Sequence, residues 1–397
     1  MRSSVLSFAA GAASALVIVS VAGVPLSSRI PTPQRGALDS VDERDEAGRL
    51  TSEVSRSTLA LPRAETATYH ALNPEGELIE PIPDDVEEFF EDYLEHDYVP
   101  ARIELGRALF HDVRLSTNDT LSCASCHDLR YGGIDRAITP TGYRMQIGSI
   151  NTPSVFNAVF NLGQFWDGRA PDLETQAGGP PTAPGEMGST WAEISSKLIA
   201  DLSMKRRFEE AFPGADFSVA IDSRYVVEAI SDFERTLITP NSPFDRYLMG
   251  DEEAVSETVK QGYQDFKDLG CIECHNGMAV GGASYQRLGR EKEYFDPGMS
   301  GVHLGRYNVT GKETDRHFFK VSSLRNIALT APYLHDGSKD TLEEVIAAMG
   351  EYQLGTSLPE HQVARIAEFL RSLTGEFRGL PLDELQNTTE FPTPPKN

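Results

Sequence analysis

The clearest hydrophobic pattern in the chain is helical, and it occurs twice. Each copy consists of four apolar residues spaced by three, three and four positions, which places all four on one face of an α-helix. The two copies are Val227, Ile230, Phe233, Leu237 and Val363, Ile366, Phe369, Leu373. No run of alternating polar and apolar residues indicates a sheet, so the chain is predicted to be mostly α.

These two helices belong to a longer internal duplication. Each half reads as a helical segment with the pattern G-x-x-x-F, then C-x-x-C-H, then loops, then the closing helix. The C-x-x-C-H motifs occupy 123–127 and 271–275, and a Pro-rich break, T-P-N-S-P at 239–243, separates the halves. We expect two mostly helical domains in tandem, an N-terminal one over 86–240 and a C-terminal one over 241–380.

The beginning of the chain has the pattern of an export signal. Arg2 is followed by a small and apolar stretch over 5–26, and the next charged residue is Arg29. A charged start, an apolar run and small residues at 21–23 are typical of a cleaved signal peptide, although the run is also just long enough to span a bilayer. Residues 1–26 are therefore predicted to be a signal peptide or an N-terminal membrane tether, and the protein to be periplasmic.

Charge is concentrated in the spacer that follows. Residues 39–97 hold 18 acidic and four basic residues, whereas the whole chain has 60 acidic and 36 basic residues and a net charge of -24. Such acidity argues against a nucleic-acid binder, which needs a basic surface. The Pro-containing spacer over 27–85 is predicted to be a disordered tether, and 381–397 a disordered tail.

The four cysteines of the chain all belong to the two C-x-x-C-H motifs. In c-type cytochromes the two thiols of such a motif bond covalently to haem, and the histidine ligates the iron. A zinc half-site or a redox dithiol would share C-x-x-C but would not explain a histidine after both pairs. Two covalently bound haem c groups are therefore predicted, one in each of two tandem cytochrome c-like domains. Their ligands are Cys123, Cys126, His127 and Cys271, Cys274, His275.

The second axial ligand of each iron decides between an electron carrier, which has strong ligands on both faces, and an enzyme with one open face. Spacing alone does not choose this ligand. After the first motif the nearest donors are Tyr143, Met145 and Met187. After the second motif the donors are Met278, Met299, His303, His317, His335 and Met349.

From about 86 to 378 the chain resembles the bacterial dihaem cytochrome c peroxidases of the CCP/MauG superfamily. The matching segments include L-G-R-A-L-F at 105–110, N-T-P-S-V-F-N at 151–157, F-W-D-G-R-A at 165–170, P-G-E-M-G at 184–188 and F-K-V-S-S-L-R-N-I-A-L-T-A-P-Y-L-H-D-G at 319–337. The resemblance implies a homodimer and the reduction of hydrogen peroxide to water. Electrons would come from a small cytochrome c or a cupredoxin through a high-potential C-terminal haem, and peroxide would bind at a low-potential N-terminal haem.

The resemblance also implies roles for single residues. Met349 would join His275 on the C-terminal haem, and Trp166 would bridge the two haems for electrons. Glu186 would carry a proton between the two oxygens of peroxide, and Gln176 would orient the peroxide. Calcium ligands are implied between the domains. They are Asn151, Thr330 and Pro332.

The chain departs from the family at one position. Most members have a histidine sixteen residues after the first haem motif, which blocks the resting N-terminal haem; here that position is Tyr143. Tyr143 could leave the iron open, since a neutral phenol is a poor ligand, or bind ferric iron as phenolate, as in catalase. A third alternative is that Met145 or His111 reaches the iron.

Two other functions remain open at this point. A MauG-like oxidase would act on a protein or another organic substrate, but in those enzymes a tyrosine replaces the methionine ligand, and this chain keeps Met349. A non-enzymatic dihaem electron-transfer protein would leave Glu186 and Gln176 without a task. Cytochrome c peroxidase activity is therefore the prediction.

Overall fold

The computed structural model describes residues 78–82 and 99–387, which all belong to one compact unit. The predicted signal or anchor over 1–26 and most of the acidic spacer lie outside the described residues. Within the described ranges, none of the helices combines the length and the apolar character needed to cross a membrane.

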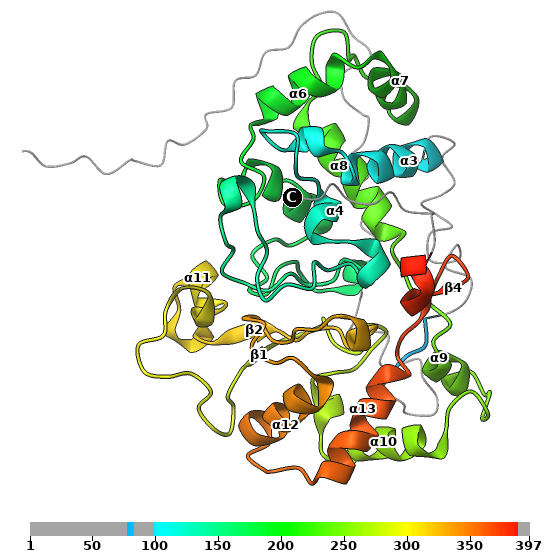
Figure 1. Cartoon of the computed structure of the whole chain (residues 1–397), viewed down its shortest axis with the longest axis vertical. Helices are drawn as coiled ribbons and strands as arrows, with labels where there is room; N and C mark the ends of the chain where they lie inside the picture. The colour runs from blue at the N-terminus through cyan, green and yellow to red at the C-terminus, as the bar shows by residue number, and fades with distance from the viewer. Residues whose placement is uncertain (1–77, 83–98, 388–397) are drawn as a thin grey trace, which may run out of the picture. The chain divides into compact units, whose positions relative to one another are not determined.

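The described chain is mostly helical, as predicted (Figure 1). The first half contains α3 (Val99–Phe110), α4 (Cys123–Cys126), α5 (Leu173–Ala177), α6 (Trp191–Ile199), α7 (Leu202–Ala211) and α8 (Ser223–Arg235). The second half contains α9 (Pro243–Leu248), α10 (Glu257–Asp268), α11 (Tyr307–Thr310), α12 (Leu342–Gln353) and α13 (Glu360–Arg371). The strands form two antiparallel pairs, β1 (Tyr285–Arg287) with β2 (Phe318–Lys320), and β3 (Glu376–Phe377) with β4 (Leu380–Pro381).

Each half is built around a pair of helices that cross at a glycine. A Cβ atom on Gly106 of α3 would lie 1.8 Å from the carbonyl oxygen of Ala229 in α8. A Cβ atom on Gly262 of α10 would lie 2.0 Å from the carbonyl oxygen of Arg365 in α13. Only glycine allows such a close approach of two helix backbones. The repeated G-x-x-x-F pattern therefore marks the same helix crossing in both halves.

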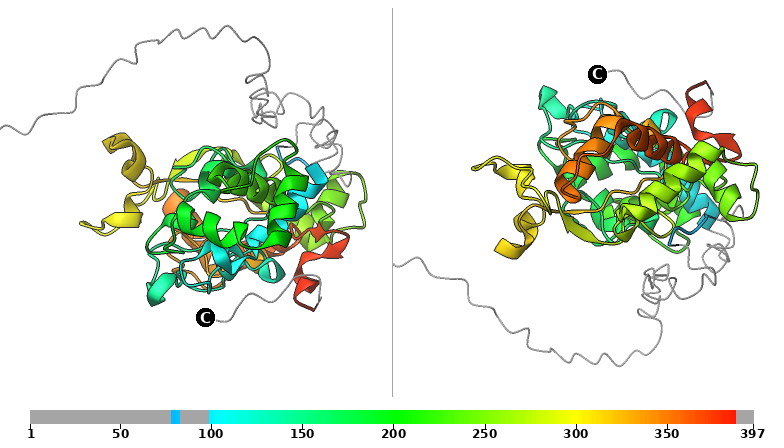
Figure 2. Two further views of the ribbon diagram at one scale, coloured as in Figure 1. Left: turned by 90° about the horizontal axis from the view of Figure 1, so that it is seen from above. Right: turned by 90° about the horizontal axis from the view of Figure 1, so that it is seen from below.

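The predicted apolar faces of the closing helices point into these crossings. Seven of the eight residues are buried, and the eighth, Val227, is half-buried against the first core. Leu237 and Leu373 lie two residues beyond the ends of α8 and α13, and both are fully buried. Figures 1 and 2 show α12, α13 and α10 close together in the second half.

One side chain in the Pro-rich segment between the halves accepts a hydrogen bond from each half. Thr239 Oγ1 accepts from Asn157 Nδ2 at 2.8 Å and from Asn326 Nδ2 at 2.9 Å. The two asparagines are equivalents in the duplication, and both have a left-handed backbone. Next to this point, a fully buried ion pair joins Arg325 and Asp245 at 2.7 Å.

Two predictions of disorder are wrong at their edges. Ile79 and Ile82, in the predicted spacer, are fully buried, and the Ile82 N–H donates to the Asp245 carboxylate at 3.2 Å. Leu382 and Leu385, in the predicted tail, are fully buried in the core of the first half. Both segments are polar overall, which led to the prediction of disorder. A few apolar residues in each are nevertheless buried, and their burial orders the chain around them.

The domain boundaries stay a prediction. Each half has its own large hydrophobic cluster, which suits a tandem arrangement. However, Phe377 packs with Leu382 and Leu385 on the first cluster, so the end of the chain returns to the first half.

Candidate haem sites

The second C-x-x-C-H motif follows α10 directly. Gly270, with φ of +79°, turns the chain into a 3-10 helix over Cys271–Glu273, and the His275 N–H donates to the Cys271 carbonyl at 3.1 Å. Burial lowers the pKa of His275 to about 4, which keeps its imidazole neutral. Its Nδ1 atom is buried and makes no hydrogen bond to any described residue. A neutral imidazole is the form that ligates a metal.

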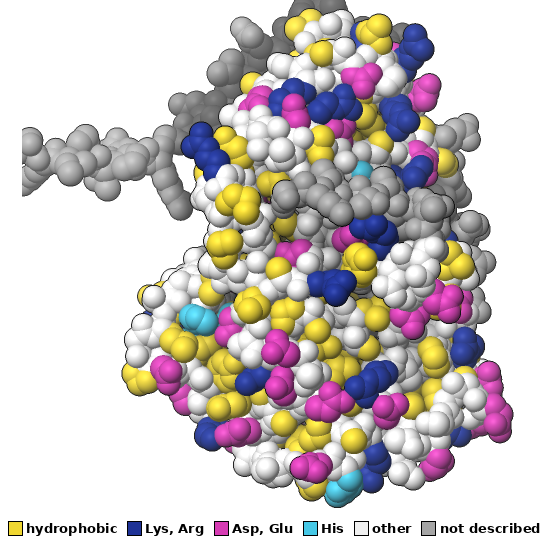
Figure 3. Space-filling view, in the orientation of Figure 1, with side chains coloured by type: hydrophobic (Ala, Val, Ile, Leu, Met, Phe, Trp, Pro, Cys, Tyr) yellow, Lys and Arg dark blue, Asp and Glu magenta, His cyan; other side chains and the backbone are white. Residues whose placement is uncertain are grey.

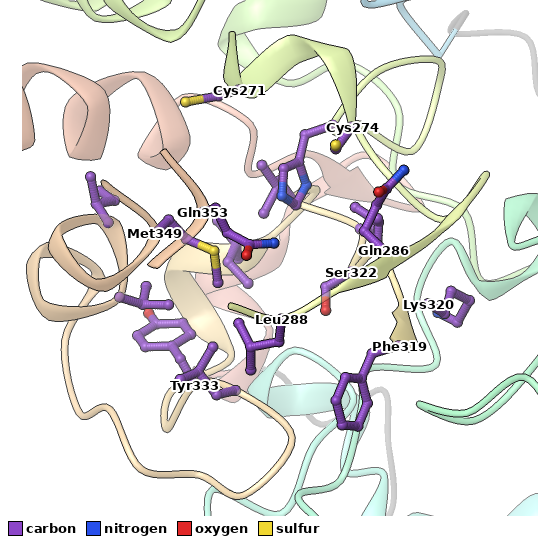
Figure 4. A pocket seen from close by; sticks show the side chains of 18 of the residues that line it. Cys271, Cys274, Gln286, Leu288, Phe319, Lys320, Ser322, Tyr333, Met349 and Gln353 are labelled. Atoms are coloured by element: carbon purple, nitrogen blue, oxygen red, sulfur yellow. The ribbon is translucent and has the colours of Figure 1, made fainter. Parts of the chain in front are cut away.

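A cavity of about 490 Å³ surrounds this histidine. Cys271, Cys274 and His275 line it, and so does Met349, which comes from α12 (Figure 4). A capping box formed by Thr341 and Glu344 fixes the start of α12. Two free thiols, a neutral imidazole and a thioether around one cavity are the groups that a covalent haem with His and Met ligands requires.

Gln353 shapes the same cavity and was not predicted as a site residue. Its Oε1 accepts the N–H groups of Gly289 and Arg290 at 2.8 and 3.0 Å, and its Nε2 donates to the Arg287 carbonyl at 3.0 Å. One side chain thus ties the last turn of α12 to the chain that leaves β1. None of the sequence patterns described above indicated this role.

The first C-x-x-C-H motif forms the short helix α4. At its start the Ser122 N–H donates to Ser125 Oγ at 3.0 Å. His127 Nδ1 lies 3.2 Å from the Gly133 carbonyl oxygen, an acceptor that requires the proton on Nδ1 and leaves Nε2 free for a metal. Burial is also the main cause of the lowered pKa of His127. The ligands around His127 therefore fit a covalent haem as well.

Glu186 lies on the loop between α5 and α6, close to the first haem motif. Burial raises the pKa of Cys126 to about 12, and the carboxylates of Asp135 and Glu186 add to this rise. The side chain of Glu186 stays exposed, yet the surrounding chain desolvates its carboxyl group enough to raise its pKa, against the opposing charge of Arg169. Gln176 lies in α5, at the start of the same loop.

Tyr143 packs on the loop that carries Glu186. The Tyr143 N–H donates to the Glu186 carbonyl at 2.6 Å. Its ring covers Gly188 so closely that a Cβ atom there would lie 2.6 Å from the ring. By contrast, Met145 is 70% exposed, and His111 Nδ1 bonds to the Arg107 carbonyl at 2.9 Å. Whether Tyr143, Met145 or His111 reaches the iron stays a prediction.

Trp166 extends from the first half to the wall of the cavity in the second. Its Nε1 donates to the Asn151 carbonyl at 2.9 Å, and its own carbonyl accepts the Lys320 N–H at 2.9 Å. The predicted calcium ligands line the same cavity. Among the described residues, nothing donates a hydrogen bond to Asn151 Oδ1 or to the carbonyl oxygens of Thr330 and Pro332. Three such oxygens suit a hard cation.

His303 and His335, two of the donors considered for the second iron, form a group with Asp336 next to Trp166. His303 Nδ1 and His335 Nε2 lie 2.9 Å apart, and the ligand atoms of both histidines and of Asp336 lie within 4.8 Å of one another. One hydrogen bond explains the short distance between the imidazoles. Burial lowers the pKa of His335 to about 4, so this buried member stays neutral.

Comparison with known proteins gives consistent matches to one family. The family described as di-haem cytochrome c peroxidase matches residues 100–253. Cytochrome c peroxidase Ccp of Escherichia coli K12 is 43% identical over 337 residues, which cover 83% of this chain and 69% of that protein. Cytochrome c551 peroxidase of Nitrosomonas europaea is 48% identical over 274 residues, which cover 69% of this chain and 80% of that protein.

A solved structure agrees with these sequence matches. A MauG-like protein associated with microbial copper homeostasis superposes with a TM-score of 0.63 at 29% identity, over 75% of this chain and 93% of its own.

Proposed function

Because the chain belongs to the di-haem cytochrome c peroxidase family, we propose that it reduces hydrogen peroxide to two molecules of water. The observation that carries this proposal is the cavity that unites Cys271, Cys274 and His275 with Met349. This cavity would supply the histidine and methionine pair of an electron-receiving haem, and the first motif would hold a second, separate haem.

Covalently bound haem would supply the redox-active iron at both sites. Cys123, Cys126 and His127 would hold the haem at which peroxide is reduced. The residues of the second cavity would hold the haem that receives electrons from a small cytochrome c or a cupredoxin. Trp166, which reaches the cavity wall from the first half, would shorten the electron route between the two haems.

Proton transfer is the task of the loop between α5 and α6. Peroxide must lose a proton from one oxygen and gain one on the oxygen that leaves as water. The carboxylate of Glu186 would carry this proton, and its raised pKa brings it closer to the pH at which the enzyme works. Gln176, at the end of α5, would orient the peroxide by hydrogen bonding.

Tyr143 would leave the peroxide-reducing site open in the resting enzyme. Its hydroxyl makes no hydrogen bond to any described residue, while its backbone and ring hold the Glu186 loop. A neutral phenol competes poorly for iron. We therefore expect turnover without prior reduction of the enzyme.

The setting of the enzyme is also part of the proposal. Haem attachment to C-x-x-C-H takes place outside the cytoplasm, which agrees with export through residues 1–26 to the periplasm. Calcium at Asn151, Thr330 and Pro332 would brace the turn next to Trp166. On the face shown in Figure 3, acidic, basic and hydrophobic side chains are interspersed, so a donor would meet no single-sign surface there.

A steady-state assay tests the proposal. The purified holoenzyme is mixed with hydrogen peroxide and a reduced small cytochrome c, and oxidation of the cytochrome is followed with and without peroxide. We expect peroxide-dependent oxidation of two cytochromes per peroxide. If peroxide drives the oxidation of no small cytochrome or cupredoxin but does drive the oxidation of an organic substrate, the result would instead support a MauG-like oxidase, the second candidate that the structural match favours.

A further inference from the structure

Lys320 lies in the wall of the haem cavity and has no partner among the residues that the structure describes. It ends β2, and it lines the same cavity as His275 and Met349 (Figure 4). Its ammonium group forms no hydrogen bond and no ion pair with any described residue. Burial lowers the pKa of Lys320 to about 8, and no carboxylate of the described chain opposes this shift.

A second partly buried lysine, Lys197, differs because carboxylates of the chain itself are its counter-ions. Lys197 lies 2.9 Å from the Asp119 carboxylate and 2.8 Å from that of Glu193. Its pKa is raised, although burial alone would lower it. The Lys320 side chain is half-buried, and a charge that leaves water without such partners is costly, so its partner is expected from outside the described residues.

The position of Lys320 indicates which anion this is. In Figure 4, Cys271 and Cys274 lie at one end of the cavity, and Phe319 and Lys320 lie toward the other. Thioether bonds fix the vinyl side of a haem, and its two carboxylates are on the opposite side. The haem carboxylates would therefore point toward the end at which Lys320 lies.

We propose that Lys320 binds a carboxylate of the haem held by Cys271 and Cys274. Together with the thioethers, this ion pair fixes the haem at both ends. Since the Lys320 N–H donates to the Trp166 carbonyl, the same residue ties the carboxylate edge of the haem to the predicted electron bridge. The proposal rests on the proposed haem at this site, but not on peroxide reduction.

Replacement of Lys320 by Met tests the proposal through the reduction potentials of the two haems, measured by spectroelectrochemical titration of the holoprotein. A nearby positive charge favours the reduced haem, so its loss should lower the potential of the haem ligated by His275. We expect the equilibrium constant for reduction to fall about tenfold, which is about 59 mV for one electron. Lys320→Arg keeps the charge and should stay within about threefold of the native value.

Lys312→Met is the matched control, because it removes an exposed lysine from the same half. It should leave both potentials unchanged. If Lys320→Met does not accumulate, Lys320→Gln makes the same comparison with a polar, uncharged side chain. Unchanged potentials in a variant with two haems would overturn the proposal, and so would a shift confined to the haem ligated by His127. The titration uses neither peroxide nor donor, so its failure is separate from failure of the peroxidase assay.

Discussion

The rings of Trp166 and His335 pack edge-to-face, with their centroids 6.3 Å apart. The two residues occupy equivalent positions in the internal duplication. Each follows a residue with a left-handed backbone, Phe165 at φ +66° and Leu334 at φ +69°, and each precedes an Asp-Gly pair. The same turn, used twice, therefore delivers one ring from each half to the wall of the second haem cavity.

Trp166→Phe should weaken this junction. The variant loses the hydrogen bond from Nε1 to the Asn151 carbonyl, which is worth about 1 kcal/mol of unfolding free energy. We expect peroxide-dependent turnover to fall about tenfold, equivalent to about 1.4 kcal/mol in the barrier, because the indole no longer shortens the electron route. Stopped-flow oxidation of the reduced donor measures the rate. Native turnover with both haems attached would remove Trp166 from the route.

Gly262→Ala should destabilise the second half. The added methyl group would lie 2.0 Å from the Arg365 carbonyl oxygen, so α10 and α13 must separate. Overpacking of this kind costs about 1–3 kcal/mol of unfolding free energy. Alanine forms a helix better than glycine by about 1 kcal/mol, so this gain is smaller than most of the range of the overpacking cost. Urea unfolding followed by circular dichroism measures the change. The neighbouring exposed Gln261→Ala is the control and should not lower stability.

The helix crossings could be predicted because their signals are local. G-x-x-x-F lies within one helix in each half, and the apolar face lies within a second helix except for its last residue. The structure buries all of these residues but the half-buried Val227. The covalent haem motifs are equally local, since three residues at a fixed spacing define each one. The structure adds that Met349 reaches the cavity of the second motif.

Other features depend on contacts between distant segments and left no local signal. Lys320 is one of many charged residues in the sequence, and it stands out only because the described part of the fold gives it no partner. Ile79 and Leu382 lie in polar segments, and their burial depends on cores that are completed elsewhere in the chain. The hydrogen bond between His303 and His335 joins residues 32 positions apart.

Leu382→Ala tests whether the end of the chain stabilises the first half. The side chain is fully buried in the first core, so its truncation should cost about 2–5 kcal/mol of unfolding free energy. Leu202→Ala removes the same atoms from a side chain that is 70% exposed and should change stability by less than about 0.5 kcal/mol. Equal effects of the two substitutions would show that the return of the chain to the first core contributes nothing.

Glu186→Gln should lower kcat/KM for peroxide by about 10²–10⁴-fold, because an amide cannot accept the proton. The carboxyl group must be ionised to accept it, so activity should rise with pH through the pKa of Glu186. Since desolvation raises this pKa above its usual value, the acid limb should lie above pH 4.5. The limb should vanish in the variant, while the haem spectra stay native. Glu210→Gln, on an exposed face of α7, is the control.

Tyr143→His should supply the blocking histidine ligand that this chain lacks at the N-terminal haem. Imidazole is a strong haem ligand, whereas a neutral phenol is a weak one. The backbone at this position is held by the hydrogen bond to the Glu186 carbonyl, so the new ring would start from the same place as the phenol. We expect the fully oxidised variant to turn over at least about tenfold more slowly than its half-reduced form.

The native enzyme should show no such dependence, and its oxidised form should give a high-spin signal in electron paramagnetic resonance. Tyr143→Phe separates ligation from packing, because it keeps the ring over Gly188 and removes the hydroxyl. If the hydroxyl does not bind iron, the spectrum of Tyr143→Phe should match that of the native enzyme. A purely low-spin native spectrum that becomes high-spin in Tyr143→Phe would instead show that the phenolate is the ligand.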